Sequence, residues 1–166
     1  MPIIRDGELY IISHSPEQTA RLGARLGALL RPGDIVCLTG EMGAGKTLFS
    51  SGVGRGWGAQ HRLTSPTYTL VHQHERDADD TLLYHLDCYR LEREADVEML
   101  GLDDMLDDDA VLLIEWAVKI ANLLPPECLW IHIRLHEVTR RKMLFEGQGD
   151  HYRELIEAFR AQTFGG

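Results

Sequence analysis

The chain has 166 residues and a formal net charge of −9, and this length predicts one domain, residues 1–166, that folds without disulfides. The acidic balance argues against unaided binding to RNA or DNA, because nucleic-acid phosphates repel an acidic surface. No stretch approaches the ~20 apolar residues of a membrane span, and the N-terminus lacks a basic segment followed by an apolar one. The three cysteines are far apart, form no C-x-x-C pair and suit a reducing compartment. We therefore expect a cytoplasmic protein that contacts neither a membrane nor DNA.

The chain opens with a strand pattern followed by a helix pattern. Residues 8–12 are rich in strand-forming side chains and are predicted as an edge strand. Ser15 before Pro16 provides an N-cap and a proline at the first helical position, so a helix is expected from there to about Leu30. The apolar run at 35–39 then predicts a buried strand.

A phosphate-binding pattern follows this strand directly. Residues 40–47 match G-x-x-x-x-G-K-[ST] at every specified position. Glycines let the backbone turn its N–H groups around a phosphate, while Lys46 would reach the β/γ-phosphates and Thr47 would hold Mg²⁺. A helix beginning near Lys46 would direct its positive N-terminal dipole at the same phosphates. The alternative is a glycine turn with an exposed lysine. The residues predicted to bind the nucleotide are Glu41, Met42, Gly43, Ala44, Gly45, Lys46, Thr47 and Leu48.

Glycines are frequent in the segment that follows, at Gly52, Gly54, Gly56 and Gly58. Each interior glycine costs a helix about 1 kcal/mol relative to alanine. The helix therefore either ends early or uses its glycines for close packing on the sheet, and the sequence leaves both possibilities open.

A hydroxyl-rich turn, Ser65-Pro66-Thr67-Tyr68, comes next. It is placed either to sense a γ-phosphate through Mg²⁺, as switch loops do, or simply to turn the chain before a strand. Residues 68–75 and 81–86 flank an acidic turn and predict a hairpin. His72 and His74 share a face of its first strand, but no third residue suggests itself for a metal site.

The motif His85-Leu86-Asp87-Cys88-Tyr89-Arg90-Leu91 ends the second hairpin strand, and ligands bind at strand ends in open α/β sheets. Asp87 could bind Mg²⁺ directly or through water, because this hard ion prefers oxygen. Arg90 could stabilise transferred phosphate charge. A salt-bridged strand end explains the same residues without any ligand. Residues 92–100 then predict a helix that ends at Gly101.

An acid after a buried strand forms the last candidate site. The acidic stretch at 103–109 is interpreted as a solvated loop, and the unbroken apolar run within 109–115 predicts a central strand. Glu115 at its end has the setting of a Walker B residue and could hold a Mg²⁺-bound water or orient the attacking water. Trp116 packs either beside the nucleotide or in the core. The remaining predicted elements are a short helix at 117–123, strands at 128–135 and 140–146, and an amphipathic helix at 149–162.

The order of these elements predicts the fold class. A strand, a glycine loop and a helix follow one another as in P-loop NTPases, and helices alternate with later strands. We expect a single-domain, P-loop NTPase-like α/β protein with three α/β/α layers and a mixed, mostly parallel sheet.

Four motifs in this order resemble the TsaE (YjeE) family of small bacterial P-loop ATPases. They are residues 40–47, 65–68 and 85–91 together with Ile114-Glu115-Trp116, and the ordered set is much more specific than the phosphate loop alone. Two positions depart from the family pattern: Leu48 stands where a second threonine is frequent, and Ala117-Val118 stands where a proline–acid pair is common.

The resemblance implies a role in making threonylcarbamoyladenosine, the modified base beside the anticodon of tRNAs that read A-starting codons. It implies an ATP hydrolase that uses ATP and Mg²⁺ and is weak by itself. Its partners would be the TsaB and TsaD proteins, whose complex it resets, and it would meet tRNA only through that complex. It also implies site roles. Lys46, Glu115 and Thr67 would be catalytic, and Thr47 and Asp87 would place Mg²⁺ together with Glu115.

Two other functions stay open. One is a nucleotide-switched binding module in which hydrolysis is not required, and the other is a small P-loop kinase. Kinases usually close an arginine-rich lid over the acceptor, whereas this chain has Arg90 and Arg93 after the predicted strand and no such lid between later elements. No adenine-specific motif is visible, so the expectation of ATP rather than GTP comes from the resemblance.

Overall fold

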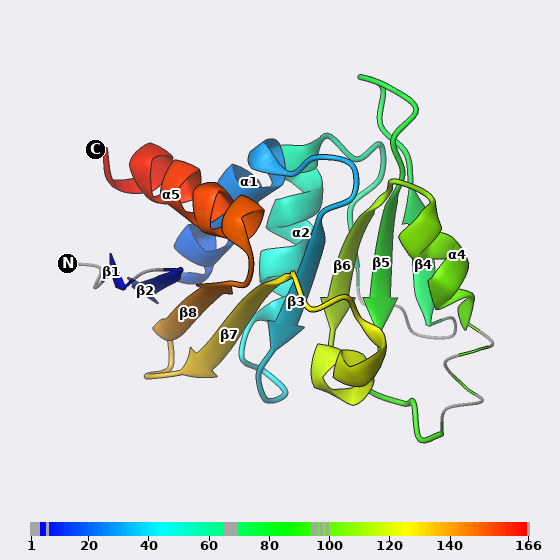
Figure 1. The fold of residues 1–166 in the computed structure, drawn as a ribbon. Helices are drawn as coiled ribbons and strands as arrows, with labels where there is room; N and C mark the ends of the chain where they lie inside the picture. Colours follow the sequence, from blue (N-terminus) through cyan, green and yellow to red (C-terminus); the bar gives the residue numbers. More distant parts are fainter. Residues whose placement is uncertain are drawn as a thin grey trace.

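One mixed β-sheet organises the molecule. The computed structural model describes residues 4–5, 7–64, 70–93, 96, 98 and 100–165. Within these residues, eight strands pair in the order β1-β2-β8-β7-β3-β6-β5-β4 (Figure 1). The strands are β1 (Ile4–Arg5), β2 (Glu8–Ser13), β3 (Ile35–Thr39), β4 (Val71–His74), β5 (Leu83–Asp87), β6 (Val111–Glu115), β7 (Leu129–Leu135) and β8 (Arg141–Gly147). The helices are α1 (Pro16–Leu29), α2 (Lys46–Trp57), α4 (Leu102–Asp107), the 3₁₀ helix η1 (Ala117–Leu123) and α5 (Asp150–Phe164).

The central strands of the sheet run parallel. β3 lies between β6 and β7, and β5 pairs with β6, all in one direction. The pairings of β1 with β2, β2 with β8, β8 with β7 and β4 with β5 are antiparallel. The predicted α/β fold with a mixed sheet is confirmed, with the parallel strands in the middle. Because parallel strands end together, the carboxyl ends of β3, β5, β6 and β7 meet at one edge (Figure 1), where ligands bind in such sheets.

Helices cover both faces of the parallel strands. α1, α2 and α5 pack on one face, where they enclose Val36 and Leu38 of β3. η1 and α4 pack on the other face with Ile35 and Cys37. Side chains of β3 are therefore buried on both sides, which explains its unbroken apolar sequence. This is the three-layer α/β/α arrangement that the sequence predicts.

Two glycines of α2, Gly52 and Gly56, pack against α1 rather than the sheet, and the helix does not end early. α2 runs unbroken to Trp57. A Cβ atom on Gly56 would lie 1.8 Å from the Ala24 carbonyl oxygen of α1, and one on Gly27 would lie 2.0 Å from the Val53 carbonyl oxygen of α2. Only glycine therefore lets the two helix backbones meet. Two further glycines make the same kind of contact, Gly23 in α1 and Gly52 in α2.

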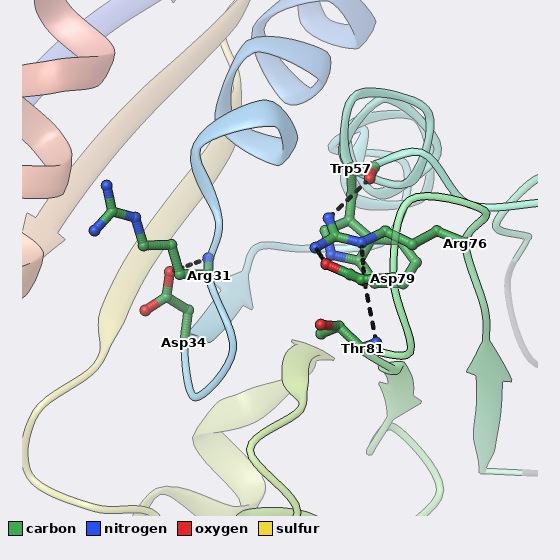
Figure 2. A network of polar contacts seen from close by, with 6 residues as sticks. All are labelled: Arg31, Asp34, Trp57, Arg76, Asp79 and Thr81. Carbon is green, nitrogen blue, oxygen red and sulfur yellow. Dashed lines mark hydrogen bonds and ion pairs between the residues drawn. The ribbon is translucent and has the colours of Figure 1, made fainter.

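The turn before β3 is fixed by side chains from α5. Asp34 accepts a hydrogen bond from the Arg31 amide at 2.8 Å, which closes the turn (Figure 2). Its other carboxylate oxygen lies 2.6 Å from His151 Nε2, and the Tyr152 hydroxyl accepts a bond from the Ile35 amide at 3.0 Å. Asp34 is buried, so these contacts satisfy groups that would otherwise be costly to bury. β3, which leads into the phosphate loop, therefore starts from a fixed point.

The acidic turn between β4 and β5 is tied to the end of α2. Arg76 donates hydrogen bonds to Asp79 at 2.7 and 2.6 Å and another at 3.2 Å to the Trp57 carbonyl oxygen (Figure 2). Its guanidinium also lies 4.7 Å from the centroid of the Trp57 ring. The hydrogen bonds from Arg76, with that from the Thr81 amide, lower the pKa of the Asp79 carboxyl to about 2. The turn thus holds the hairpin against α2.

Two local predictions were wrong. β2 is not an edge strand, because β1 pairs with its outer side. The stretch at 103–109 is not a loop throughout, since α4 spans Leu102–Asp107 and buries Leu102 and Met105 among its acids. The predicted helix at 92–100 lies partly outside the described residues. Elsewhere in the described chain the predicted strands and helices are confirmed to within a few residues at their ends.

Replacing Gly27 with alanine tests the contact between the two helices. In an ordinary helix this change gains about 1 kcal/mol. Here the new methyl group would collide with the Val53 carbonyl, so we expect the free energy of unfolding to fall by about 2 kcal/mol, as overpacking does. Urea unfolding measures the difference. Ala28→Gly, at an exposed position of the same helix, is the control and should cost about 1 kcal/mol through propensity alone. A Gly27→Ala protein as stable as its parent would contradict the close contact.

Candidate functional site

The loop between β3 and α2 lies at the edge where the parallel strands end. Gly40, Gly43 and Gly45 have φ angles of 146°, 80° and 106°, values in the left-handed region that favours glycine. A Cβ atom on Gly40 would also lie 2.3 Å from the Ile133 carbonyl oxygen of β7. α2 starts at Lys46 with no side-chain cap on its first turn. The first amide groups of the helix are therefore left without a side-chain acceptor at the loop.

The side chain of Lys46 folds into this loop. Its Nζ donates hydrogen bonds to the carbonyl oxygens of Gly40 and Glu41, the second at 2.7 Å, and lies 4.5 Å from the centroid of the Trp116 ring. Lys46 is only 6% exposed. Burial lowers the pKa of its ammonium, and nearby carboxylates oppose this effect, Glu115 foremost. None of the ion pairs among the described residues includes Lys46, so its charge is held by neutral groups that an anion can replace.

Two strand ends bring carboxylates beside the start of α2. Glu115 ends β6, Asp87 ends β5, and the two residues are paired in register. The Thr47 hydroxyl donates to Glu115 Oε1 at 3.4 Å. Asp87 accepts a hydrogen bond from the Tyr89 amide at 3.0 Å. The structure therefore brings the three predicted Mg²⁺ ligands to one edge of the sheet.

Glu115 has a second polar partner within the sheet. His85 Nε2 lies 2.6 Å from Glu115 Oε2, and both residues are buried. The two interpretations of the 85–91 motif, a ligand site and a salt-bridged strand end, are therefore not exclusive. The histidine of the motif pairs with Glu115, while Asp87 ends β5 near enough to Lys46 for its charge to act on the ammonium.

Aromatic side chains line one side of the site. Trp116 follows β6 with a left-handed φ of 58°, and its ring packs against the core beneath η1 as well as beside the Lys46 ammonium. The Tyr89 ring lies 4.9 Å from the Trp116 ring, centroid to centroid. The Lys119 ammonium donates to the Tyr89 carbonyl oxygen. Packing of Trp116 in the core is therefore confirmed, and its place beside the nucleotide stays a prediction that the contact with Lys46 allows.

Arg141 is a residue at the loop that sequence reasoning missed. Its Nε donates to the Ala44 carbonyl oxygen at 2.9 Å and its Nη2 to that of Gly43 at 3.4 Å. Its Nη1 donates to three carbonyl oxygens of the turn between β7 and β8, including that of Val138 at 3.2 Å. The guanidinium therefore ties the phosphate loop to this turn. No local pattern predicts the contact, because Arg141 and Ala44 are 97 positions apart.

The remaining predicted residues lie at the rim of the site or outside the described chain. Thr67, with the rest of 65–68, lies outside the described residues. Met42 is 71% exposed at the tip of the loop. Leu48 lines a hollow between α1 and α2, and Arg90 is exposed on the turn after β5. Over the described part of the chain, no three His, Cys, Asp or Glu side chains form a group that could hold a metal ion.

Comparison with known proteins identifies the family. A family model described as "Threonylcarbamoyl adenosine biosynthesis protein TsaE" matches residues 13–143, which include the phosphate loop, Glu115 and Arg141. The chain belongs to the TsaE family. This family takes part in tRNA threonylcarbamoyladenosine biosynthesis, as the resemblance implied.

Individual relatives and a solved structure agree with this assignment. The tRNA threonylcarbamoyladenosine biosynthesis protein TsaE of Bacillus subtilis is 38% identical over 144 residues, 86% of this chain and 88% of the relative. Its counterpart in Treponema pallidum is 38% identical over 125 residues, 75% of this chain and 90% of the relative. The crystal structure of Bacillus subtilis YdiB matches the fold with a TM-score of 0.79 and 29% identity, covering 98% of both chains. Among the helices described in our structure, none has the length and apolar character needed to cross a bilayer.

Arg141→Ala tests whether this side chain fixes the phosphate loop. Loss of the hydrogen bonds to two loop carbonyls should speed hydrogen exchange of the amides at 41–45 and lower the free energy of unfolding by about 1 kcal/mol. Amide exchange followed by mass spectrometry and urea unfolding are the measurements. Lys142→Ala, the next residue of β8, is the matched control and should change neither. Unaltered exchange in the Arg141→Ala loop would show that the guanidinium does not hold it.

Proposed function

We propose that this TsaE-family protein is a Mg²⁺-dependent ATPase, weak alone, that works with the TsaB and TsaD proteins. Binding and hydrolysis of ATP would reset that complex between rounds of threonylcarbamoyladenosine formation, and tRNA would be met through the partners. The observation that carries the proposal is the contact of Thr47 with Glu115 beside the buried Lys46. A glycine loop and a strand-end acid that meet at the same edge form the two halves of a nucleotide-hydrolysing site.

The loop supports the binding of a phosphate chain. Lys46 is bound to two carbonyl oxygens and to no carboxylate among the described ion pairs, so an incoming phosphate would exchange neutral partners for a charged one. Charge-assisted hydrogen bonds are roughly twice as strong as neutral ones, which favours this exchange. The first turn of α2 begins at the same point, and its uncapped amides and dipole favour an anion.

The donor set suits Mg²⁺ that arrives with a nucleotide. Mg²⁺ is usually bound through one or two carboxylates together with substrate phosphates and waters, rather than by an all-protein cage. Thr47, Asp87 and Glu115 offer oxygen ligands of this kind at the edge of the sheet. When bound, Mg²⁺ would neutralise charge on the β- and γ-phosphates.

The position of Glu115 supports one of its two predicted roles. Its Oε1 accepts a hydrogen bond from the hydroxyl of Thr47, the residue predicted to hold Mg²⁺. A carboxylate next to a metal ligand can accept a hydrogen bond from a metal-bound water and keep that water in place. We therefore assign Glu115 to the Mg²⁺-bound water, ahead of a role in orienting the attacking water.

The partners of the described arginines favour the ATPase over the kinase alternative. A phosphoryl-transfer lid needs guanidinium groups that close over the phosphates. Arg141 instead binds backbone carbonyls of the loop, and Arg93 lies 3.9 Å from Asp96. A binding module would use the same phosphate loop as an ATPase, so an experiment has to distinguish these two functions.

Lys46→Ala tests nucleotide binding. Loss of charge-assisted hydrogen bonds worth roughly 1.5–3 kcal/mol each should weaken ATP binding by about 10- to 100-fold. Calorimetric titration with Mg²⁺–ATP measures the affinity. Lys142→Ala removes the same charge from β8 and should leave ATP affinity unchanged. Equal affinity in the Lys46→Ala protein would remove the basis of the proposal.

Glu115→Gln separates an ATPase from a binding module. The amide keeps the size of the side chain but loses the charge that acts on the Mg²⁺-bound water, so we expect ATP binding to persist and turnover to fall by about 100-fold or more. Phosphate release is measured for the protein alone and with TsaB, TsaD and tRNA, together with the number of tRNA molecules modified per complex. Modification that continues over many rounds without hydrolysis would establish the binding module instead.

A further inference from the structure

We propose that His85 is a positioning residue for Glu115, the acid of this site. It holds one oxygen of the Glu115 carboxylate so that the other oxygen faces Thr47. The inference rests on the proposed hydrolysis at this site. It gives a role to His85 in the 85–91 motif, in which the sequence pointed to Asp87 as the Mg²⁺ ligand.

The contact is short, buried and directed at one oxygen of the acid. His85 is 0% exposed and Glu115 is 2% exposed, and Nε2 of the first lies 2.6 Å from Oε2 of the second. The other oxygen, Oε1, receives the Thr47 hydroxyl. The two oxygens of Glu115 are therefore divided between one partner inside the sheet and one at the phosphate loop. A carboxylate held at both oxygens cannot rotate freely about its last bond.

The second nitrogen of the His85 ring supports this assignment. Nδ1 is buried and has no hydrogen-bond partner. An orphaned polar atom in the interior costs free energy, so an apolar side chain would suit this position better on packing alone. Among the described residues, the polar contact of the ring is the one with Glu115. Since a carboxylate accepts hydrogen bonds, the ring directs an N–H on Nε2 at Glu115.

His74 provides a matched comparison on the neighbouring strand. It is also buried, at 8% exposure, and its Nε2 also lacks a partner. Burial is the main cause that lowers the pKa of its imidazole to about 4, and the neighbouring histidines His85, His72 and His61 lower it further. Its ring is therefore neutral near pH 7.5. No hydrogen bond within the described chain joins His74 to Glu115 or the phosphate loop, so the two histidines share burial but differ in the contact.

Loss of the His85 contact should affect turnover more than ATP binding. Without the N–H, Oε2 is left as a buried acceptor, and the carboxylate is free to turn away from Thr47. Such a turn moves the charge from its place beside the Mg²⁺ ligand. The phosphate loop itself, with Lys46 and Arg141, has no hydrogen bond to His85 among the described residues, so the affinity for ATP should be kept.

Three variants of the full chain test the proposal by their ATPase kinetics at pH 7.5. His85→Leu should lower kcat by about 10- to 100-fold, the usual effect of losing the partner of a ligand, with KM for ATP changed by less than about threefold. His85→Gln can return an N–H donor to the Nε2 position and should restore kcat to within about fivefold of the parent. His74→Leu should leave both constants unchanged. Thermal unfolding of each variant shows whether it is folded.

A signal that needs no catalysis separates this proposal from the proposed function. The side-chain carboxyl carbon of Glu115, labelled with ¹³C and assigned by its loss in Glu115→Gln, should shift in His85→Leu and not in His74→Leu. If the parent protein does not hydrolyse ATP, the proposed ATPase fails, while this carboxyl signal still tests the contact. A folded His85→Leu protein with parental kcat and an unshifted signal overturns the positioning role. So does a His85→Gln protein that is as impaired as His85→Leu while equally well folded.

Discussion

The parallel pairing of β3 with β6 is the constraint on which the site depends. It sets Leu38 opposite Glu115, so the loop that follows β3 leaves the sheet beside the acid that ends β6. Two other interactions make this placement rigid. The bonds of Asp34 with α5 fix where β3 starts, and the glycine contacts of α2 with α1 fix the direction in which the chain leaves the loop. The phosphate loop is thus held at both ends before any ligand is present.

Cations on two sides of the loop control its backbone. Lys46 binds the carbonyl oxygens of Gly40 and Glu41, while Arg141 binds those of Gly43 and Ala44. In a planar peptide group the N–H points opposite to the carbonyl. When Arg141 draws the Ala44 carbonyl toward itself, the amide of the next residue must point away from it. An arginine bound to carbonyl oxygens of the loop can therefore help to set the amide directions on which a phosphate nest would depend.

What could be predicted from the sequence is what local patterns determine. The phosphate loop and the acid of Glu115 were found because each follows an apolar strand within a few residues. The partners that hold them were missed: Arg141 is 97 positions from Ala44, and His85 is 30 from Glu115. α4 was missed because it has only 6 residues, and its acidic residues obscure the pattern of the two that it buries, Leu102 and Met105. The role of Gly52 and Gly56 in α2 was ambiguous because they contact the backbone of α1, and no pattern within α2 shows that contact.

The charges at the site bear on why a metal ion would be needed. The chain carries a net charge of −9, and the carboxylates of Glu115 and Asp87 are among those that act on Lys46. Arg141 donates its hydrogen bonds to backbone carbonyls, so of the two described cations bound to the loop, Lys46 and Arg141, it is Lys46 that a phosphate would meet. One ammonium does not balance a triphosphate beside two carboxylates, and a bare nucleotide would be repelled by them. A bound Mg²⁺ would reverse this balance, because the same carboxylates would then attract the metal that the phosphate carries. The acids that make the unliganded edge unfavourable to phosphate would thus make it specific for phosphate that carries its metal.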